Sequence, residues 1–217
     1  MRKTMVTTGL SLAMLGASCL TTATAAQAAP TVVEGPDQFK VQLVSLAGTG
    51  CPAGTAAVNV SPAKDWFTIT YDAFEAEIGK GTPKSAARKA CQLGIDLDVP
   101  PGYTFTIVQI DHRGAANLAK GANANVRGVY YWSGEQSSKV ITNTLTGPFD
   151  NVWDFHDKVE EDVISVMPCG ESKTFNAKLD ISVRPGTSNP AVNGSVITLD
   201  STDVSFATKF QLTWEKC

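Results

Sequence analysis

Apolar and polar residues alternate along many short stretches of this chain, and this alternation limits the possible folds more than any other feature. The clearest case is 175–183, where every second residue is apolar, and residues 93–99 show the same period. A period of two gives an extended strand one core face and one wet face. About eleven such strands, separated by turns rich in glycine and proline, predict an all-β, antiparallel β-sandwich of the jelly-roll kind.

One stretch departs from this pattern and predicts a short helix. Thr82 can cap a helix with its hydroxyl, Pro83 suits the first helical position, and alanines fill the middle. Gly94 can end the helix in a left-handed conformation. The sequence therefore predicts one short helix over 82–94, which carries Cys91 and closes one end of the sandwich.

The first 28 residues are typical of a secretory leader. Arg2 and Lys3 precede an apolar run, and Ala26-Gln27-Ala28 forms a small-x-small cleavage site. Cleavage there would leave 29–217 as a single secreted domain with 16 basic and 21 acidic residues, a net charge of −5. This charge argues against a nucleic-acid partner, and no later run is apolar enough to predict a membrane span.

Four cysteines remain after the predicted cleavage: Cys51, Cys91, Cys169 and Cys217. An even number in an exported chain indicates two disulfides. Four cysteines allow three pairings, which the sequence does not decide. The pairing that gives one bridge to each half, Cys51–Cys91 and Cys169–Cys217, is favoured, and each bridge would close a loop of roughly 40 to 50 residues.

Several short motifs together resemble a family of small secreted proteins of unknown function from bacteria and fungi. The resemblance spans about 41–217, and it implies export, an all-β fold and a framework of the same four cysteines. It implies no activity, and so no functional residue. The motifs that carry it are Gly48-Thr49-Gly50-Cys51-Pro52, Ala86-x-Arg88-Lys89-x-Cys91-Gln92-Leu93, Pro101-Gly102-Tyr103, Asp111-x-Arg113-Gly114, Tyr131-Trp132-Ser133-Gly134, Thr146-Gly147-Pro148-Phe149, Pro168-Cys169-Gly170 and Leu212-x-Trp214-x-Lys216-Cys217.

Aromatic residues in the middle of the chain are the candidate ligand-binding residues. Tyr130 and Trp132 share one face of a predicted strand and Tyr131 takes the other, so one face is expected to be exposed. Trp153 lies in a polar stretch that predicts an irregular segment over 149–161. Exposed rings on a β-sandwich can stack on sugars. Tyr130, Trp132 and Trp153 are therefore the predicted ligand-binding residues.

The two histidines suggest a different function, an extracellular hydrolase. A serine hydrolase needs a histidine that a carboxylate orients, and both His112 and His156 have aspartates close by in the sequence. The chain has no Gly-x-Ser-x-Gly motif, however. The favoured interpretation is structural, with Asp111 and Arg113 stabilising a turn and His112 exposed.

No metal or other cofactor is predicted. Asp150, Asn151, Asp154 and Asp157 could offer oxygen ligands to calcium, but they lack the EF-hand order and its glycine, so a solvated loop is favoured. The sequence favours a non-enzymatic secreted module that binds an extracellular glycan or protein surface as a monomer. The alternatives are the hydrolase and a secreted inhibitor or toxin-like protein.

Overall fold

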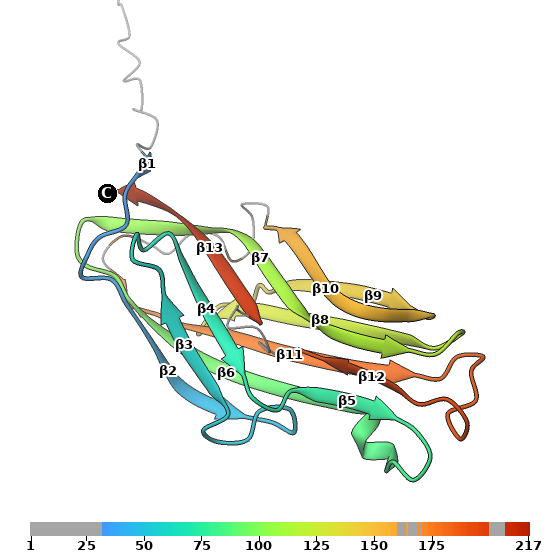
Figure 1. Ribbon diagram of the computed structural model, residues 1–217. Coiled ribbons are helices and arrows are strands. Elements are labelled where there is room, and N and C mark those ends of the chain that lie inside the picture. Colours follow the sequence, from blue (N-terminus) through green and yellow to red (C-terminus); the bar gives the residue numbers. More distant parts are fainter. Residues whose placement is uncertain (1–31, 160–163, 165–168, 170, 200–206) are drawn as a thin grey trace, which may run out of the picture.

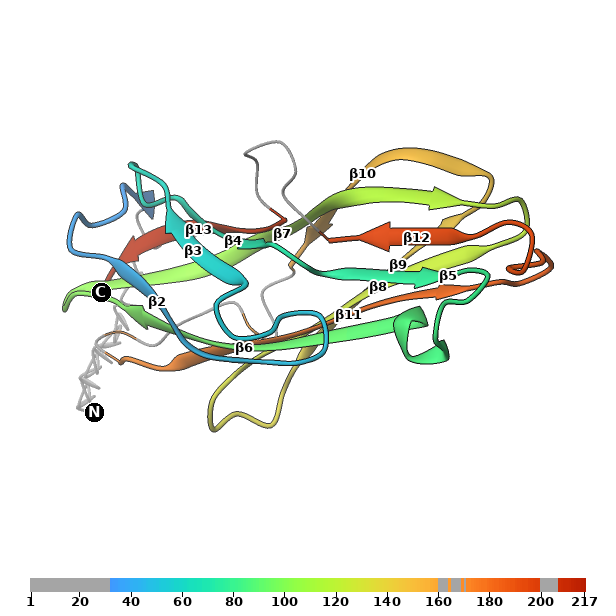
Figure 2. The same ribbon diagram turned by 60° about the horizontal axis from the view of Figure 1, so that its bottom comes forward.

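The computed structural model describes residues 32–159, 164, 169, 171–199 and 207–217 as two antiparallel β-sheets packed face to face (Figures 1 and 2). The predicted leader, 1–28, lies outside the described residues, so its cleavage stays a prediction. The strands are β1 (Val32–Val33), β2 (Lys40–Ala47), β3 (Ala56–Val60), β4 (Trp66–Tyr71), β5 (Glu75–Ile78), β6 (Arg88–Asp98), β7 (Tyr103–Leu118), β8 (Asn123–Trp132), β9 (Lys139–Thr146), β10 (Phe149–Lys158), β11 (Thr174–Arg184), β12 (Ser195–Thr198) and β13 (Thr208–Lys216).

The larger sheet has eight strands in the order β3-β4-β13-β7-β12-β5, with β1 beside β13 and β10 beside β7. The smaller sheet has five, in the order β2-β6-β11-β8-β9. Their inner faces share one hydrophobic core, to which the predicted alternation contributes directly. On β11, for example, Phe175, Ala177, Leu179, Ile181 and Val183 are all buried. The predicted antiparallel β-sandwich is therefore confirmed.

The predicted helix over 82–94 is wrong. Only Lys84–Ala87 form a helical segment, a single 3-10 turn, and β6 begins at Arg88. Cys91 and Leu93 lie on the inner face of β6, in the same period-two row as Ile95. The strand wins because β2 and β11 pair with both edges of β6, and these ladders outweigh a local preference for helix.

Both favoured disulfides are confirmed. Cys51 bonds to Cys91, and Cys169 bonds to Cys217. The first bridge joins the turn after β2 to β6, the strand beside β2 in the five-stranded sheet, and both of its cysteines are buried. The second joins residue 169, ahead of β11, to the end of β13, so it connects the two sheets.

Strand β7 runs through the middle of the larger sheet and contains a β-bulge. On β13, Gln211 pairs with Gln109 and the next residue, Leu212, pairs with Ile107, so Val108 is an extra residue on β7. The bulge reverses the alternation, because Ile107 and Ile110 both face the core although they are three residues apart. The bulge therefore places Asp111 on the outer face of the sheet and His112 on the inner face, and this sets the geometry of the candidate site.

One segment predicted to be irregular forms a strand instead. The predicted irregular segment at 149–161 contains β10, which pairs with β7 along its whole length. Within the described part of the chain, no helix is long and apolar enough to cross a membrane.

Candidate functional site

The three rings predicted to bind a ligand lie in the core. Tyr130, Trp132 and Trp153 are 0%, 4% and 4% exposed. Trp132 donates its indole N–H to the carbonyl of Ile164 at 3.1 Å, and Tyr130 stacks on Phe175. These positions leave no open ring face for a sugar, so we do not assign these residues to a ligand site.

The residue between the two buried rings faces the other way. Tyr131 lies on the outer face of β8 and is half-buried, and the ammonium of Lys178 on β11 lies 5.2 Å from the centre of its ring. A cation over a tyrosine ring is attracted by the negative charge of the ring face. The aromatic residue of this strand that faces away from the core is therefore Tyr131.

His112 lies on the inner face of β7 and is fully buried, which corrects the expectation that it is exposed. Its Nε2 lies 2.6 Å from the hydroxyl of Tyr130. Its Nδ1 has no hydrogen-bond partner within the described residues, and the nearest carboxylate oxygen, on Asp157, is 3.9 Å away. Burial lowers the pKa of His112 to about 4, although the charge of Asp111 acts in the opposite direction. The imidazole is therefore neutral at pH 7.

Asp111 lies on the outer face of β7, yet its side chain is fully buried beneath its neighbours. Gln109 donates to Oδ1 at 2.6 Å, while Gln211 and Lys209 donate to Oδ2, each at 3.0 Å. His156 Nδ1 lies 2.9 Å from Oδ1. Burial opposes ionisation, but these four hydrogen bonds lower the pKa of Asp111 below its ordinary value. Asp111 is thus a carboxylate held by two neighbouring strands, not one end of a turn-stabilising pair.

His156 is the exposed member of this network, with 58% of its side chain accessible. The hydrogen bond to Asp111 is the main cause that raises the pKa of His156 above its ordinary value. A buried carboxylate that orients an exposed histidine forms two of the three groups of a catalytic triad. Among the hydrogen bonds of the described residues, none joins a serine or a cysteine to His156, so the nucleophile of a triad is missing from this set.

The burial of His112 predicts that acid destabilises the protein. The pKa of such a histidine is lower in the folded protein than in the unfolded chain, where it is about 6.5. As the pH falls from 6.5 toward the folded pKa, the unfolded chain binds a proton that the folded protein does not, so the free energy of unfolding decreases. Between pH 6.5 and 4 we expect a loss of about 3 kcal/mol. Urea unfolding across this range tests this.

The two histidines supply matched variants for this test. His112→Gln should remove most of the acid-dependent loss between pH 6.5 and 4. His156→Gln should keep that loss, since His156 has a raised pKa and stabilises the fold below about pH 6.5. An unchanged pH profile in His112→Gln would contradict the assignment.

The four oxygen-bearing residues considered for calcium do not converge. On β10, Asp150 and Asp154 lie on the outer face, while Asp157 lies on the inner face, where Asn143 of β9 donates to it at 2.7 Å. The described residues contain no group of three or more His, Cys, Asp or Glu side chains that could hold a metal ion. This segment is therefore an edge strand and not the expected solvated loop, and the carboxylates lie on its two opposite faces.

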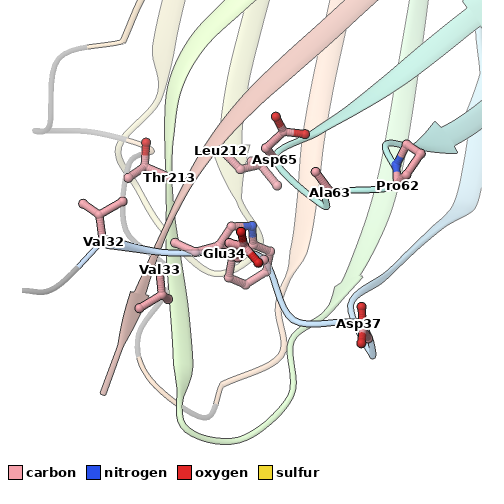
Figure 3. Close-up of a pocket in the computed structure, with 11 residues that line it drawn as sticks. Val32, Val33, Glu34, Asp37, Pro62, Ala63, Asp65, Leu212 and Thr213 are labelled. Carbon is pink, nitrogen blue, oxygen red and sulfur yellow. The ribbon is translucent and has the colours of Figure 1, made fainter.

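A hollow of about 450 Å³ lies where β1 and β13 meet the turn before β4 (Figure 3). Glu34, Asp37 and Asp65 contribute carboxylates to it, and Asp65 accepts a hydrogen bond from the hydroxyl of Ser61 at 2.7 Å. None of the three carboxylates forms an ion pair within the described part of the chain. This hollow is therefore acidic, and it lacks every residue that the sequence predicted for a site.

Two further hollows adjoin each other on the outer face of the five-stranded sheet. They measure about 610 and 380 Å³, and Arg88, Arg127 and Asp180 line both. Strand pairing brings these residues together, because Asp180 on β11 is opposite Arg127 of β8 and Ala90 of β6. We call this surface the arginine face; its remaining polar lining comprises Gln92, Asn125, Thr142, Lys178, Ser182 and Arg184.

Cations outnumber anions on the arginine face. Around the two hollows lie the four basic side chains of Arg88, Arg127, Lys178 and Arg184, and one acidic side chain, Asp180. Arg88 donates its Nε–H to Asp180, but 72% of its side chain remains exposed. Sequence analysis missed this face. The alternation does place Lys178, Asp180 and Arg184 on one side of a strand, but only the strand pairing adds Arg88 and Arg127.

Comparison with known proteins gives a family but no activity. Residues 37–217 match the family model described as "Domain of unknown function (DUF4360)". An uncharacterized secreted protein of Arthroderma benhamiae is 33% identical over 182 residues, which cover 84% of this chain and 73% of that protein. The resemblance to small secreted proteins of unknown function is therefore confirmed.

Two solved structures show a weak likeness to this chain. One is TmCBM61 in complex with β-1,4-galactotriose, at a TM-score of 0.23 and 9% identity, covering 83% of this chain and 90% of that one. The other is the enzymatically active domain of tailspike protein 4 of bacteriophage CBA120, at a TM-score of 0.23 and 13% identity, covering 83% and 20%. Neither score is high enough to bear on function. The match over residues 37–217 and the fungal relative show that this chain belongs to the family described as a domain of unknown function (DUF4360).

Proposed function

We propose that this protein is a secreted, non-enzymatic module that binds an extracellular glycan on its arginine face. One observation carries the proposal: two adjoining hollows on an open sheet face, lined by nine residues with hydrogen-bonding side chains and by apolar surface between them. Pockets for small molecules are mostly enclosed. An open surface that combines many hydrogen-bonding side chains with apolar surface suits a sugar, whose hydroxyl groups both donate and accept hydrogen bonds.

Secretion is supported by three independent features. The first 28 residues are typical of a secretory leader. Two disulfides join distant parts of the chain, as is usual for proteins in oxidising compartments. The fungal relative is a secreted protein. A disulfide-stabilised β-sandwich would remain folded outside the cell while its open sheet face holds a ligand.

The glycan proposal predicts that small polar changes on the arginine face weaken binding. Gln92 and Thr142 are exposed and line different hollows, so Gln92→Ala with Thr142→Ala removes hydrogen-bonding groups from both. Retention on an array of immobilised polysaccharides is the measurement. We expect the double variant to bind the retained polysaccharide about tenfold more weakly, as befits the loss of one or two hydrogen bonds.

Asn117→Ala is the matched control for this experiment. Asn117 is exposed on the outer face of the eight-stranded sheet, opposite the arginine face, and its variant should bind like the parent protein. Equal weakening by both variants would exclude the arginine face as the site. If no polysaccharide on the array retains the parent protein, the proposed function is wrong.

The orientation of His156 by Asp111 favours one alternative function, an extracellular hydrolase. Assays on ester, peptide and glycoside substrates distinguish it from the binding module. Activity that disappears in His156→Gln, while the fold and the polysaccharide retention persist, would establish the hydrolase. Activity that survives this change would exclude His156 as a catalytic base.

A further inference from the structure

We infer that the ligand of the arginine face is acidic, a polysaccharide that carries carboxylate or sulfate groups. This inference rests on the proposed function and adds the chemical class of the glycan. It follows from the charge, the spacing and the hydrogen-bonding capacity of the basic side chains on this face.

The basic side chains exceed what Asp180 can neutralise, and Asp180 is the only acidic residue among the described residues that line the two hollows. Arg88 and Arg127 approach Asp180 from the strands on either side of β11. Asp180 accepts from Arg88, whereas Arg127 and Arg184 form no ion pair within the described residues. A guanidinium has five N–H donors, so even Arg88 keeps donors for a ligand.

The rest of the molecule has the opposite charge. The predicted mature chain has a net charge of −5, so the surplus of cations on the arginine face is opposite in sign to the charge of the chain as a whole. The outer face of the eight-stranded sheet exposes Glu75, Glu77, Asp150 and Asp154, and the hollow beside β1 is acidic as well. An anionic polymer would be repelled by those surfaces and attracted to the arginine face.

Arginine also matches the geometry of the acidic groups. The planar guanidinium can donate two parallel, charge-assisted hydrogen bonds to a carboxylate or a sulfate. A neutral sugar has no anionic group that could accept such a pair. Arg88 and Arg127 lie on strands on opposite sides of β11 and are offset by two residues along it, so their backbones are about 12 Å apart. A polymer with repeated acidic groups can therefore contact more than one arginine at once.

The test compares each acidic polysaccharide with its uncharged counterpart. Polygalacturonate is paired with its fully methyl-esterified form for the carboxylate, and dextran sulfate is paired with dextran for the sulfate. We expect at least about tenfold tighter binding of the oxidised, processed protein to a charged member. Binding should weaken as the ionic strength rises from about 0.01 to about 1 M, because the Debye length falls from about 30 to about 3 Å.

Arg127→Gln with Arg184→Gln should reduce binding to the charged member about tenfold and leave the thermal midpoint unchanged, since both side chains are exposed. Lys158→Gln, an exposed lysine on β10 of the other sheet, is the charge control and should not change binding. If the charged member binds more tightly in only one of the two pairs, that pair identifies the acidic group as carboxylate or sulfate. If the charged member binds more tightly in both pairs, the face recognises either acidic group.

Three results would overturn the inference. Equal binding of charged and uncharged members would disprove it while leaving the glycan proposal intact. Acidic binding that the double arginine variant retains would place the site elsewhere. Binding to double-stranded DNA as tight as to the acidic polysaccharides would show a general polyanion surface. If no polysaccharide of either kind binds, the proposed function itself fails.

Discussion

Replacing Cys51 and Cys91 together by alanine is expected to lower the free energy of unfolding by more than about 4 kcal/mol. The bridge spans 40 residues of sequence, and its removal returns the conformational freedom of that loop to the unfolded chain. Both sulfur atoms are buried in the core, so truncation also leaves unfilled space beside the five-stranded sheet. Equilibrium unfolding in urea measures the loss.

The second disulfide is the matched comparison for the first. Cys169 and Cys217 close a loop of similar length, 48 residues of separation, but both residues are exposed. Their double alanine variant should lose about 4 kcal/mol through chain entropy alone, without the packing cost. A loss of less than about 1 kcal/mol in the Cys51 and Cys91 variant would show that neither loop closure nor packing by this bridge matters.

Replacing Asp111 by alanine is expected to destabilise the protein by about 3 kcal/mol. The carboxylate is fully buried and joins three neighbouring strands, since Lys209 and Gln211 come from β13 and His156 from β10. Its removal leaves four hydrogen-bond donors without the acceptor that they share. The midpoint of unfolding in urea, at constant m-value, measures the cost.

A second variant separates the hydrogen-bond network from simple packing. Asp111→Asn keeps the shape of the side chain but removes its charge, so the pKa of His156 should fall toward its ordinary value of about 6.5, as NMR titration would record. Asp154→Asn, on the same outer face and partly exposed, should change stability by less than about 0.5 kcal/mol. An unchanged pKa of His156 in Asp111→Asn would contradict the proposed network.

The fold class could be predicted from the sequence because apolar residues occur at every second position in most strands and mark the face that joins the core. The two main errors have physical causes. Over 82–94, alanines and good capping residues favour a helix locally, but β6 gains two hydrogen-bonded neighbours that no local rule can foresee. Over 149–158, the alternation of Trp153 and Phe155 with Asp154 and His156 was present, but the abundance of polar residues hid an edge strand.

The candidate site was harder to predict, because it depends on which strands pair. In Tyr130-Tyr131-Trp132 both faces are aromatic, so the sequence could not tell which face joins the core. Asp111 and His156 are 45 residues apart, and Arg88 and Asp180 are 92 residues apart. Only the pairing and register of neighbouring strands bring such residues together. A single sequence offers the residue types of this site but not their neighbours.

The bulge at Val108 has a consequence for the way this protein can change during evolution. This one extra residue decides which face of the sheet each later residue of β7 occupies. Asp111 therefore contacts its hydrogen-bond donors on the outer face, and His112 contacts Tyr130 in the core. Deleting a residue here would exchange the two faces from 109 to 118 and bring a carboxylate into the core. This strand should therefore accept many substitutions, but relatives with a one-residue insertion or deletion within it should be rare.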